Sequence, residues 1–266
     1  MSPLSAPPPS ISAETHALRI AQAQKELALK GYAALVVNAG DSLRYFTGLP
    51  WSATERLVAL VIPAVGSARM VCPRFELGSL IESAKLQLDT ILWEEDESPF
   101  LHAVKDIPDD CAVALDRDIS LRSAEGFRLA RPGIRFNADP GIIDHMRACK
   151  TSQEIALIQH AMNITIRVIQ EAWTALRPGM RASEVIRLID ERHRAYGADN
   201  GSWFCAVQFG HATAFPHGIP GDQELQENDL VLIDTGCCIN GYHSDITRTF
   251  AFGTPDSYVH RLLTIA

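Results

Sequence analysis

Short apolar runs and amphipathic segments alternate along the first half of the chain. Ala13–Lys30 has helix-forming composition and is followed by Gly31, a residue that commonly ends helices. The apolar runs after it predict strands, and the segments of mixed polarity between them predict helices. The expected strands are 33–37, 57–62, 68–71, 90–93, 111–115 and 134–137, and the expected helices are 76–85 and 121–129. This alternation predicts an α/β layer domain.

The pattern changes at Asp139-Pro-Gly141, a turn sequence that ends the alternation. A short helix is expected at 142–150. A capping box then predicts the start of a long helix, because the hydroxyl of Thr151 and the carboxylate of Glu154 can each satisfy a free backbone N–H. An apolar stripe with steps of three and four residues predicts its buried face: Ile155, Ile158, Ala161, Met162, Thr165, Ile169 and Ala172.

Helices and strands separate in the rest of the chain. A second helix carries Val185, Leu188 and Ile189 and is expected to stop at Gly197, whereas strands and turns follow from Trp203. Helices followed by antiparallel strands predict an α+β domain, with a last helix at 257–265. We therefore expect two domains, 1–146 and 147–266. Residues 1–12 are expected to be mobile because they are terminal and rich in proline.

Composition agrees with a folded protein of two domains. The chain has 266 residues, of which 47% are hydrophobic and 21% are charged, so apolar side chains suffice for two cores. Lys and Arg number 24 against 32 Asp and Glu, a net charge of −8, and no basic run is present, so nucleic-acid binding is not expected. The longest apolar stretches, such as 57–65, are far shorter than the ~20 residues that a membrane-spanning helix needs.

The N-terminus and the cysteines indicate a compartment. Residues 1–10 have neither a basic start nor an apolar core, so they do not resemble a signal peptide. The six cysteines include no CxxC pair, and a chain of this length does not need disulfides. Cys237 and Cys238 would point to opposite faces of a strand, which favours packing over a redox or metal pair. We expect a cytoplasmic protein with reduced thiols and no membrane role.

A β-hairpin is predicted around Asn240-Gly241, the dipeptide most typical of a type I′ turn. A two-residue turn there pairs Asp234 with Thr247 and Gly236 with Asp245. Residues that are opposed, or two apart along a strand, share a face, so Asp234, Asp245 and Thr247 should project to the same side. The two carboxylates would then be diagonal neighbours, roughly 7–8 Å apart at Cα and closer at their side chains.

The residues alone allow two interpretations of these aspartates. Asp234 could cap a turn while Asp245 is solvated, as is common for aspartates on hairpins. Alternatively, because two ionised carboxylates at this separation repel each other, a divalent metal or a shared proton could hold them together. Asp234 directly follows an apolar run, 231–233, and an aspartate at the end of a buried strand is seldom explained by solubility.

The two aspartates lie in a motif of several residues. Asp234-Thr-Gly, followed by Gly241-Tyr-His-Ser-Asp245-Ile-Thr-Arg-Thr249, resembles the signature of the pita-bread metallopeptidases, which include Xaa-Pro dipeptidases (prolidases) and Xaa-Pro aminopeptidases. The resemblance implies that Asp234 chelates one ion of a dinuclear metal centre and that Asp245 bridges both ions. Upstream, Phe215-Pro-His217-Gly218 resembles the family's Pro-His-Gly segment, which implies that His217 contacts the substrate near the reacting carbonyl. His211 has no such support and is expected to be structural.

Two weaker matches extend the resemblance over most of the chain. Residues 41–48 resemble a loop of the family's creatinase-like N-terminal domain, and 146–154 resemble its linker into the catalytic domain. Together they imply an α/β creatinase-like domain followed by an α+β pita-bread domain. The family further implies a homodimer that hydrolyses the bond before proline in dipeptides or short peptides. Its nucleophile would be a hydroxide bridging two ions, Mn²⁺ in the first place and otherwise Co²⁺ or Zn²⁺.

The chain departs from the family in one respect. The family's site has five ligands, and its remaining His and two Glu follow the hairpin, whereas this chain ends at Ala266, shortly after Asp245. The resemblance therefore implies the front portion of a pita-bread domain, truncated at its C-terminus, with an incomplete metal site that could leave this form inactive. Two alternatives stay open: a creatinase-like or cyclic-amide C–N hydrolase without metal, and a non-catalytic pita-bread module that binds a protein.

Overall fold

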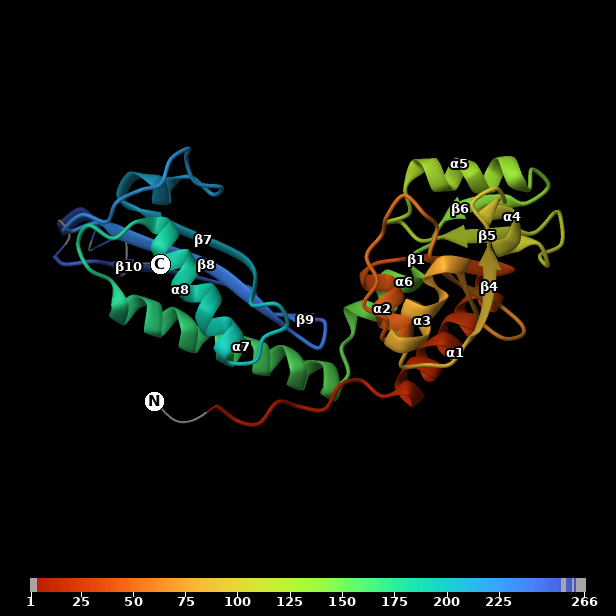
Figure 1. The fold of residues 1–266 in the computed structure, drawn as a ribbon, viewed down its shortest axis with the longest axis horizontal. Helices are drawn as coiled ribbons and strands as arrows, with labels where there is room; N and C mark the ends of the chain where they lie inside the picture. Colours follow the sequence, from red (N-terminus) through yellow and green to blue (C-terminus); the bar gives the residue numbers. More distant parts are fainter. Residues whose placement is uncertain (1–3, 255–256, 260, 262–266) are drawn as a thin grey trace. The chain divides into compact units, whose positions relative to one another are not determined.

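The computed structural model describes residues 4–254, 257–259 and 261. The chain forms two compact units: the N-terminal unit comprises residues 11–150, and the C-terminal unit joins the segment that ends at Ser10 to the part that begins at Thr151 (Figure 1). The boundary expected after Met146 falls inside helix α6 (Ile142–Ala148). Ser10 accepts a hydrogen bond from the Gln153 amide at 3.1 Å, while the mobility of residues 1–12 stays a prediction. The helix expected at 257–265 lies largely outside the described residues.

The N-terminal unit is built on a six-stranded mixed sheet with the order β4-β3-β2-β1-β5-β6. Central strand β1 is antiparallel to β2 and parallel to β5. The strands are β1 (Ala34–Asn38), β2 (Ala59–Pro63), β3 (Arg69–Pro73), β4 (Asp89–Trp93), β5 (Ala112–Leu115) and β6 (Arg135–Ala138). The helices are α1 (Ala13–Lys30), α2 (Asp41–Thr47), α3 (Leu77–Ser83), α4 (Pro99–Val104), α5 (Leu121–Ala130) and α6, with a 3₁₀ turn, η1 (Arg74–Glu76), before α3. This architecture confirms the expected α/β layer domain.

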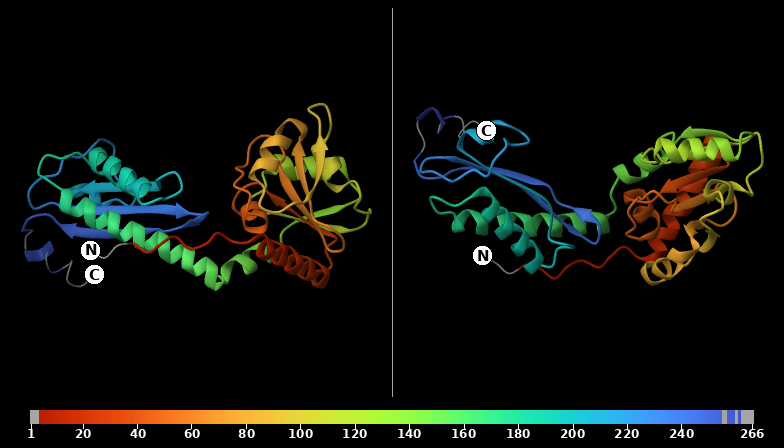
Figure 2. Two further views of the ribbon diagram at one scale, coloured as in Figure 1. Left: turned by 60° about the horizontal axis from the view of Figure 1, so that its bottom comes forward. Right: turned by 45° about the horizontal axis from the view of Figure 1, so that its top comes forward.

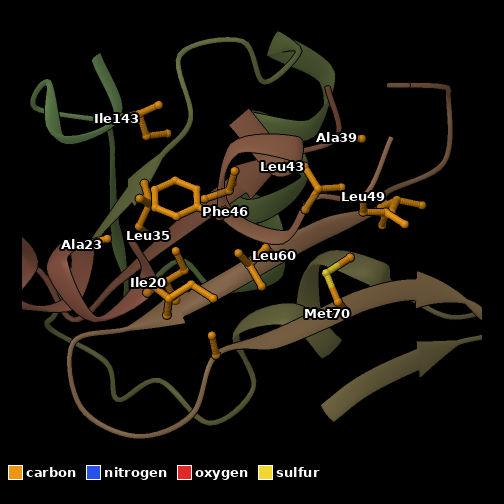
Figure 3. Close-up of a cluster of buried hydrophobic side chains, with 14 of the residues drawn as sticks. Ile20, Ala23, Leu35, Ala39, Leu43, Phe46, Leu49, Leu60, Met70 and Ile143 are labelled. Atoms are coloured by element: carbon orange, nitrogen blue, oxygen red, sulfur yellow. The ribbon is translucent and has the colours of Figure 1, made fainter. Parts of the chain in front are cut away.

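Helices cover both faces of this sheet. Alternate residues of a strand point to opposite faces. Leu35 and Val37 of β1 accordingly join a core with α1, α2, α3 and α6, whereas Ala34 and Val36 join a core with α4 and α5. Figure 3 shows part of the first core, where the side chain of Phe46 lies among the aliphatic side chains around it. The N-terminal unit therefore has two buried layers, one on each side of its sheet.

Two short helices of this unit were not expected from the hydrophobic pattern. Residues 41–48, which resembled a loop, form helix α2, and Gly48 ends it with a positive φ of 76° and an N–H bond to the Arg44 carbonyl. Helix α4 begins at Ser98, whose hydroxyl accepts from the Leu101 N–H, and has Pro99 in its first turn. Both helices span two turns or fewer, so tertiary packing rather than a long apolar stripe stabilises them.

In the described part of the C-terminal unit, two long helices cover one face of an antiparallel sheet. The helices are α7 (Ser152–Ala175) and α8 (Ala182–Ala195). The strands are β7 (Ser202–Phe209), β8 (Leu230–Ile239), β9 (Tyr242–His243) and β10 (Ile246–Ala251), with a 3₁₀ turn, η2 (Gly210–Ala214), after β7. The order is β10-β8-β7, with β9 paired to β8. Figures 1 and 2 show α7 and α8 along the same side of this sheet, which confirms the α+β expectation.

Helix α7 begins as predicted, and its buried face agrees with the predicted stripe except at the start of the helix. Thr151 and Glu154 form the reciprocal capping box, with bonds of 3.3 and 2.8 Å. The predicted stripe was wrong at its start, since Ile155 is 55% exposed. The buried face is Glu154, Leu157, His160, Ala161, Ile164, Thr165, Val168, Ile169 and Ala172. Polar residues occupy part of that face, and Glu154 accepts a hydrogen bond from the Tyr242 hydroxyl at 3.0 Å, which hydrophobicity alone does not reveal.

Two further expectations concern membranes and thiols. No helix in the described part of the chain is long and apolar enough to cross a membrane. All six cysteines are free thiols, and Cys237 and Cys238 are both buried. Burial also raises the pKa of the Cys205 thiol to about 11, so this side chain stays protonated at neutral pH. Packing is therefore the role that the structure supports for Cys205, Cys237 and Cys238.

Candidate metal and catalytic site

The hairpin that carries both aspartates has the predicted turn and register. Asn240 and Gly241 have φ values of 51° and 86°, the two left-handed positions of a type I′ turn. The pairing continues without a shift from Ile239 opposite Tyr242 to Asp234 opposite Thr247. A one-residue slip would have moved every side chain to the other face, so this register decides which groups meet.

Asp234 lies on the sheet face away from the helices. Its neighbours Ile233 and Thr235 are fully buried (0% exposed), whereas Asp234 itself is half-buried. The hydroxyl of Thr247 donates to Asp234 Oδ1 at 2.7 Å. The predicted cross-strand pair is therefore a hydrogen-bonded pair, and it holds one oxygen of the carboxylate in place.

Asp245 lies in a short break of the ladder, between the end of β9 and the start of β10. Ser244 and Ile246 on either side are buried, at 2% and 5% exposed, whereas Asp245 is exposed. Asp245 therefore points away from the core, to the side on which Asp234 and Thr247 meet. The alternation of buried and exposed residues agrees with a shared face for the two aspartates, while their shared metal site stays a prediction.

The donor atoms of this arrangement suit a divalent cation, but there are too few of them for a complete site. Carboxylate oxygens are good ligands for divalent cations, and Asp234 and Asp245 can supply them from one face. Within the described residues, however, no group of three or more His, Cys, Asp or Glu is placed to hold a metal ion. The chain thus contributes a pair of donors toward a site whose affinity would depend on further ligands.

His217 lies in the turn that follows η2. Its side chain is exposed, and Gly218 after it has a positive φ of 72° and donates its N–H to the Phe215 carbonyl at 2.9 Å. Among the described residues, the His217 ring has no hydrogen-bond partner, and no contact joins it to Asp234 or Asp245. His211 is exposed as well, and its ring packs edge-on against Phe215 with centroids 5.2 Å apart.

Gln208 is a residue of this face that the sequence pattern did not single out. It lies on β7 two residues after Ala206, the cross-strand partner of Asp234, so it shares the face of that aspartate. Gln208 is 4% exposed, and its Oε1 has no hydrogen-bond partner in the described part of the chain. A Cβ on Gly218 would lie 3.1 Å from Gln208 Nε2, so the turn that carries His217 packs directly onto this amide. The only signal in the sequence was a glutamine inside an apolar strand.

Behind the hairpin, buried polar groups connect α7 and α8. His193 is fully buried (0% exposed), with Nε2 3.2 Å from the Thr165 hydroxyl and Nδ1 2.8 Å from the Ser202 hydroxyl. Burial lowers the pKa of His193 to about 4, so the ring is neutral at neutral pH. Thr165 is in turn 2.8 Å from the Ser244 hydroxyl, which reaches the residue next to Asp245.

Comparison with known families agrees with both units. A model of the creatinase/prolidase N-terminal domain matches residues 19–149, and a model of metallopeptidase family M24 matches residues 156–266. The chain belongs to metallopeptidase family M24. Its fold is accordingly a creatinase-like domain followed by a pita-bread domain, as the motifs implied.

Similar proteins are peptidases by their names. This M24 chain is 34% identical to the probable dipeptidase PepE of Mycobacterium tuberculosis over 93% of its own length and 66% of that protein. It is 30% identical to the putative dipeptidase YkvY of Bacillus subtilis over 89% and 66%. The crystal structure of dipeptidase PepE from Mycobacterium ulcerans superposes with a TM-score of 0.84 at 29% identity, covering 96% of this chain and 70% of that one.

A more distant structure supports the fold alone. The prolidase from Thermococcus sibiricus has a TM-score of 0.85 at 23% identity, over 97% of this chain and 70% of that chain. The M24 chain thus spans about two thirds of the length of the curated relatives that it matches.

Proposed function

We propose that the protein is a metal-dependent exopeptidase that hydrolyses the bond before proline in dipeptides or short peptides. The observation that carries the proposal is the pair Asp234 and Asp245 on one open face of the hairpin, with Thr247 bonded to the first. Membership of a metallopeptidase family supports the metal dependence, relatives named dipeptidase support a peptide substrate, and the match to the creatinase/prolidase N-terminal domain supports the preference for proline. We further propose a cytoplasmic homodimer that uses Mn²⁺, with Co²⁺ or Zn²⁺ as alternatives.

Asp234 and Asp245 would hold the metal ions together with further ligands in addition to these two. Bound divalent ions would polarise the scissile carbonyl and lower the pKa of a water molecule so that hydroxide forms at neutral pH. The Thr247 hydroxyl keeps Asp234 in one orientation through its bond to Oδ1, which leaves Oδ2 directed away from that bond. The exposed position of Asp245 lets it approach the same space.

His217 is proposed to donate a hydrogen bond to the substrate oxygen on which negative charge develops. The support is its place on an exposed turn that packs on Gln208, whose strand neighbour Ala206 pairs with Asp234. Gln208 would fix the height of this turn above the sheet. Because the turn packs on Gln208 on one side and exposes His217 on the other, it can present the histidine to a substrate with little movement.

A peptidase dedicated to this bond has a physical reason. The bond before proline is a tertiary amide without an N–H, so it cannot donate the strand-like hydrogen bond by which many peptidases align their substrates. Recognition must then come from the carbonyl and from the free ends of the peptide. An open sheet face with a carboxylate pair and a histidine suits recognition of that kind.

The test compares hydrolysis of Gly-Pro with hydrolysis of Gly-Ala in added Mn²⁺, using the protein in the longest form that its gene encodes. Asp245→Asn should lower kcat/KM for Gly-Pro by at least about 100-fold, since the change removes a charged metal ligand. Asp96→Asn, an exposed aspartate of the N-terminal unit, is the matched control and should not change turnover. Equal turnover by the Asp245 variant and the unchanged protein would refute the proposal and favour the non-catalytic binding module.

A further inference from the structure

The hydroxyl, the N–H and the carbonyl of Ser244 all make hydrogen bonds, although this residue lies in a break of the ladder. Its hydroxyl accepts from the Cys237 N–H at 3.0 Å and is 2.8 Å from the Thr165 hydroxyl on α7. Its N–H donates to the Cys237 carbonyl at 2.9 Å, and its carbonyl accepts from the Trp203 indole N–H at 2.8 Å. Three elements, α7, β7 and β8, therefore fix a residue that belongs to neither β9 nor β10.

The bond from α7 is itself supported from behind. Thr165 is fully buried (0% exposed), and its hydroxyl is 3.2 Å from Nε2 of the equally buried His193 on α8. The other ring nitrogen of His193 is 2.8 Å from the Ser202 hydroxyl at the start of β7. A continuous line of buried hydrogen bonds thus runs from α8 through α7 to Ser244, and a satisfied buried network of this kind resists displacement.

Gly236 completes this arrangement by having no side chain. A Cβ built on Gly236 would overlap the Ser244 carbonyl oxygen and the Trp203 indole nitrogen. Gly236 has no positive φ, so its backbone conformation does not require glycine, whereas this close approach does. The glycine of the Asp234-Thr-Gly236 motif therefore has a packing reason: it admits the Ser244 carbonyl to its hydrogen bond with Trp203.

We propose that Ser244 is a positioning residue for Asp245, and that Thr165, Trp203 and Gly236 form the clamp that holds Ser244. Asp245 follows Ser244 directly and is exposed, and like Ser244 it lies outside the named strands, so no strand pair of its own holds its direction. The clamp on the preceding residue supplies that constraint. The inference rests on the proposed function, in which Asp245 binds metal.

The experiment measures Mn²⁺ affinity by EPR titration, and the visible absorption of bound Co²⁺, on the full chain. Ser244→Ala removes the hydroxyl that joins Cys237 and Thr165. It should weaken Mn²⁺ binding by about 10–100-fold, the usual effect of losing a group that orients a metal ligand. The Co²⁺ spectrum should change in intensity, because that intensity follows the geometry around the ion.

A pair of variants at Thr165 separates the hydroxyl from the packing of its side chain. Thr165→Val keeps the shape and removes the hydroxyl, and it should weaken Mn²⁺ binding by about 10-fold. Thr165→Ser keeps the hydroxyl and should bind Mn²⁺ nearly as the unchanged protein does. If Ser244→Ala does not fold, this pair still decides, and equal Mn²⁺ affinity of the Val and Ser variants would overturn the clamp.

Thr47→Val is the matched control in the N-terminal unit. The Thr47 hydroxyl is also buried, donates to the Leu43 carbonyl at 2.7 Å and accepts from the Leu49 N–H at 3.1 Å. This variant should lower the melting temperature but leave Mn²⁺ affinity unchanged.

Asp245→Ala distinguishes the two ways in which the inference can fail. If Asp245→Ala weakens Mn²⁺ binding while Ser244→Ala and Thr165→Val do not, the clamp is refuted and the metal ligand stands. If Asp245→Ala binds Mn²⁺ as tightly as the unchanged protein, the proposed function fails, and the clamp has no ligand to position.

Discussion

The two units of this protein use a β-sheet in opposite ways. In the N-terminal unit, helices cover both faces of the sheet, and alternate residues of β1 join two separate cores. In the C-terminal unit, the helices α7 and α8 lie along one face (Figure 2). The other face carries Asp234 and Thr247. A sheet face that is covered by helices contributes to stability, whereas an accessible face can also bind a ligand.

Carboxylates in the two units show the same difference. Asp116 of the N-terminal unit is 3% exposed, and its two oxygens accept the N–H groups of Asn38 and Asp118, each at 3.1 Å. Burial raises the pKa of this carboxyl, and the bonds identify it as a loop anchor. Asp245, by contrast, is exposed. A buried carboxylate with both oxygens engaged, such as Asp116, holds the fold, whereas an exposed one, such as Asp245, is available for a ligand.

The largest expected effect tests whether the two units are independent. Phe46→Ala empties a fully buried site in the N-terminal core and should lower the free energy of unfolding of that unit by about 3–5 kcal/mol. The hairpin should keep its structure, because the two units have separate cores. Urea unfolding measures the loss, and amide exchange of Thr235 and Cys237 reports the hairpin. Faster exchange at those two amides would break the separation between the units.

The next effect is a pH dependence of stability that arises from His193 in the buried hydrogen-bond network of the C-terminal unit. Burial lowers the pKa of His193 from 6.5 to about 4, so between these pH values the unfolded chain binds a proton that the folded chain does not. The stability that depends on neutral His193 is therefore complete above pH 6.5 and falls by roughly 3 kcal/mol as the pH falls toward 4. Urea unfolding at a series of pH values measures it.

Two glutamine variants serve as its controls. His193→Gln should be less stable at neutral pH but should lose less additional stability on acidification, since glutamine does not titrate. His211→Gln, at an exposed position, should keep the pH dependence of the unchanged protein. An unchanged pH profile in His193→Gln would show that another group carries the effect.

A smaller effect contrasts two glycines, one in each unit. Gly236→Ala forces a methyl group onto the Ser244 carbonyl and should destabilise the C-terminal unit by about 1–3 kcal/mol. Gly78 of helix α3 has open space around it, so Gly78→Ala should stabilise the N-terminal unit by about 0.5–1 kcal/mol. Urea unfolding of both variants measures the two effects, and a Gly236→Ala variant that is as stable as the unchanged protein would contradict the close approach at Gly236.

Local signals in the sequence predicted the hairpin better than they predicted the buried contacts behind it. Asn240-Gly241 fixed the turn, and the turn alone determined that Asp234 meets Thr247, because register propagates along a ladder. The roles of Asp234, Asp245 and His217 stay predictions until metal and substrate binding are measured. Most strands and the long helices also follow from periodicity and caps, which act over a few residues.

Other features could not be predicted because they depend on tertiary contacts. Helix α2 has too few residues to show a stripe and is stabilised by packing of Phe46. The burial of Thr165 was predicted from its spacing, but its hydroxyl partners His193 and Ser244 were not, because they are 28 and 79 residues away in sequence. Gln208 shows the same limit: a single polar residue in an apolar strand gives no indication of which turn packs on it.

The smallest expected effect compares helix caps in the two units. Thr151→Ala removes one half of the reciprocal capping box of α7, and Ser12→Ala removes the single cap of α1, whose hydroxyl accepts from the Thr15 N–H at 3.2 Å. Each loss should cost about 1 kcal/mol, with the larger loss at Thr151, because its hydroxyl accepts the N–H of the buried Glu154, whereas the Ser12 cap is exposed. Thermal unfolding of both variants measures the difference. Helix α7 packs on the sheet face opposite the one that carries Asp234. A larger loss for Ser12→Ala would therefore show that the stability of the C-terminal unit depends less on this helix than its packing indicates.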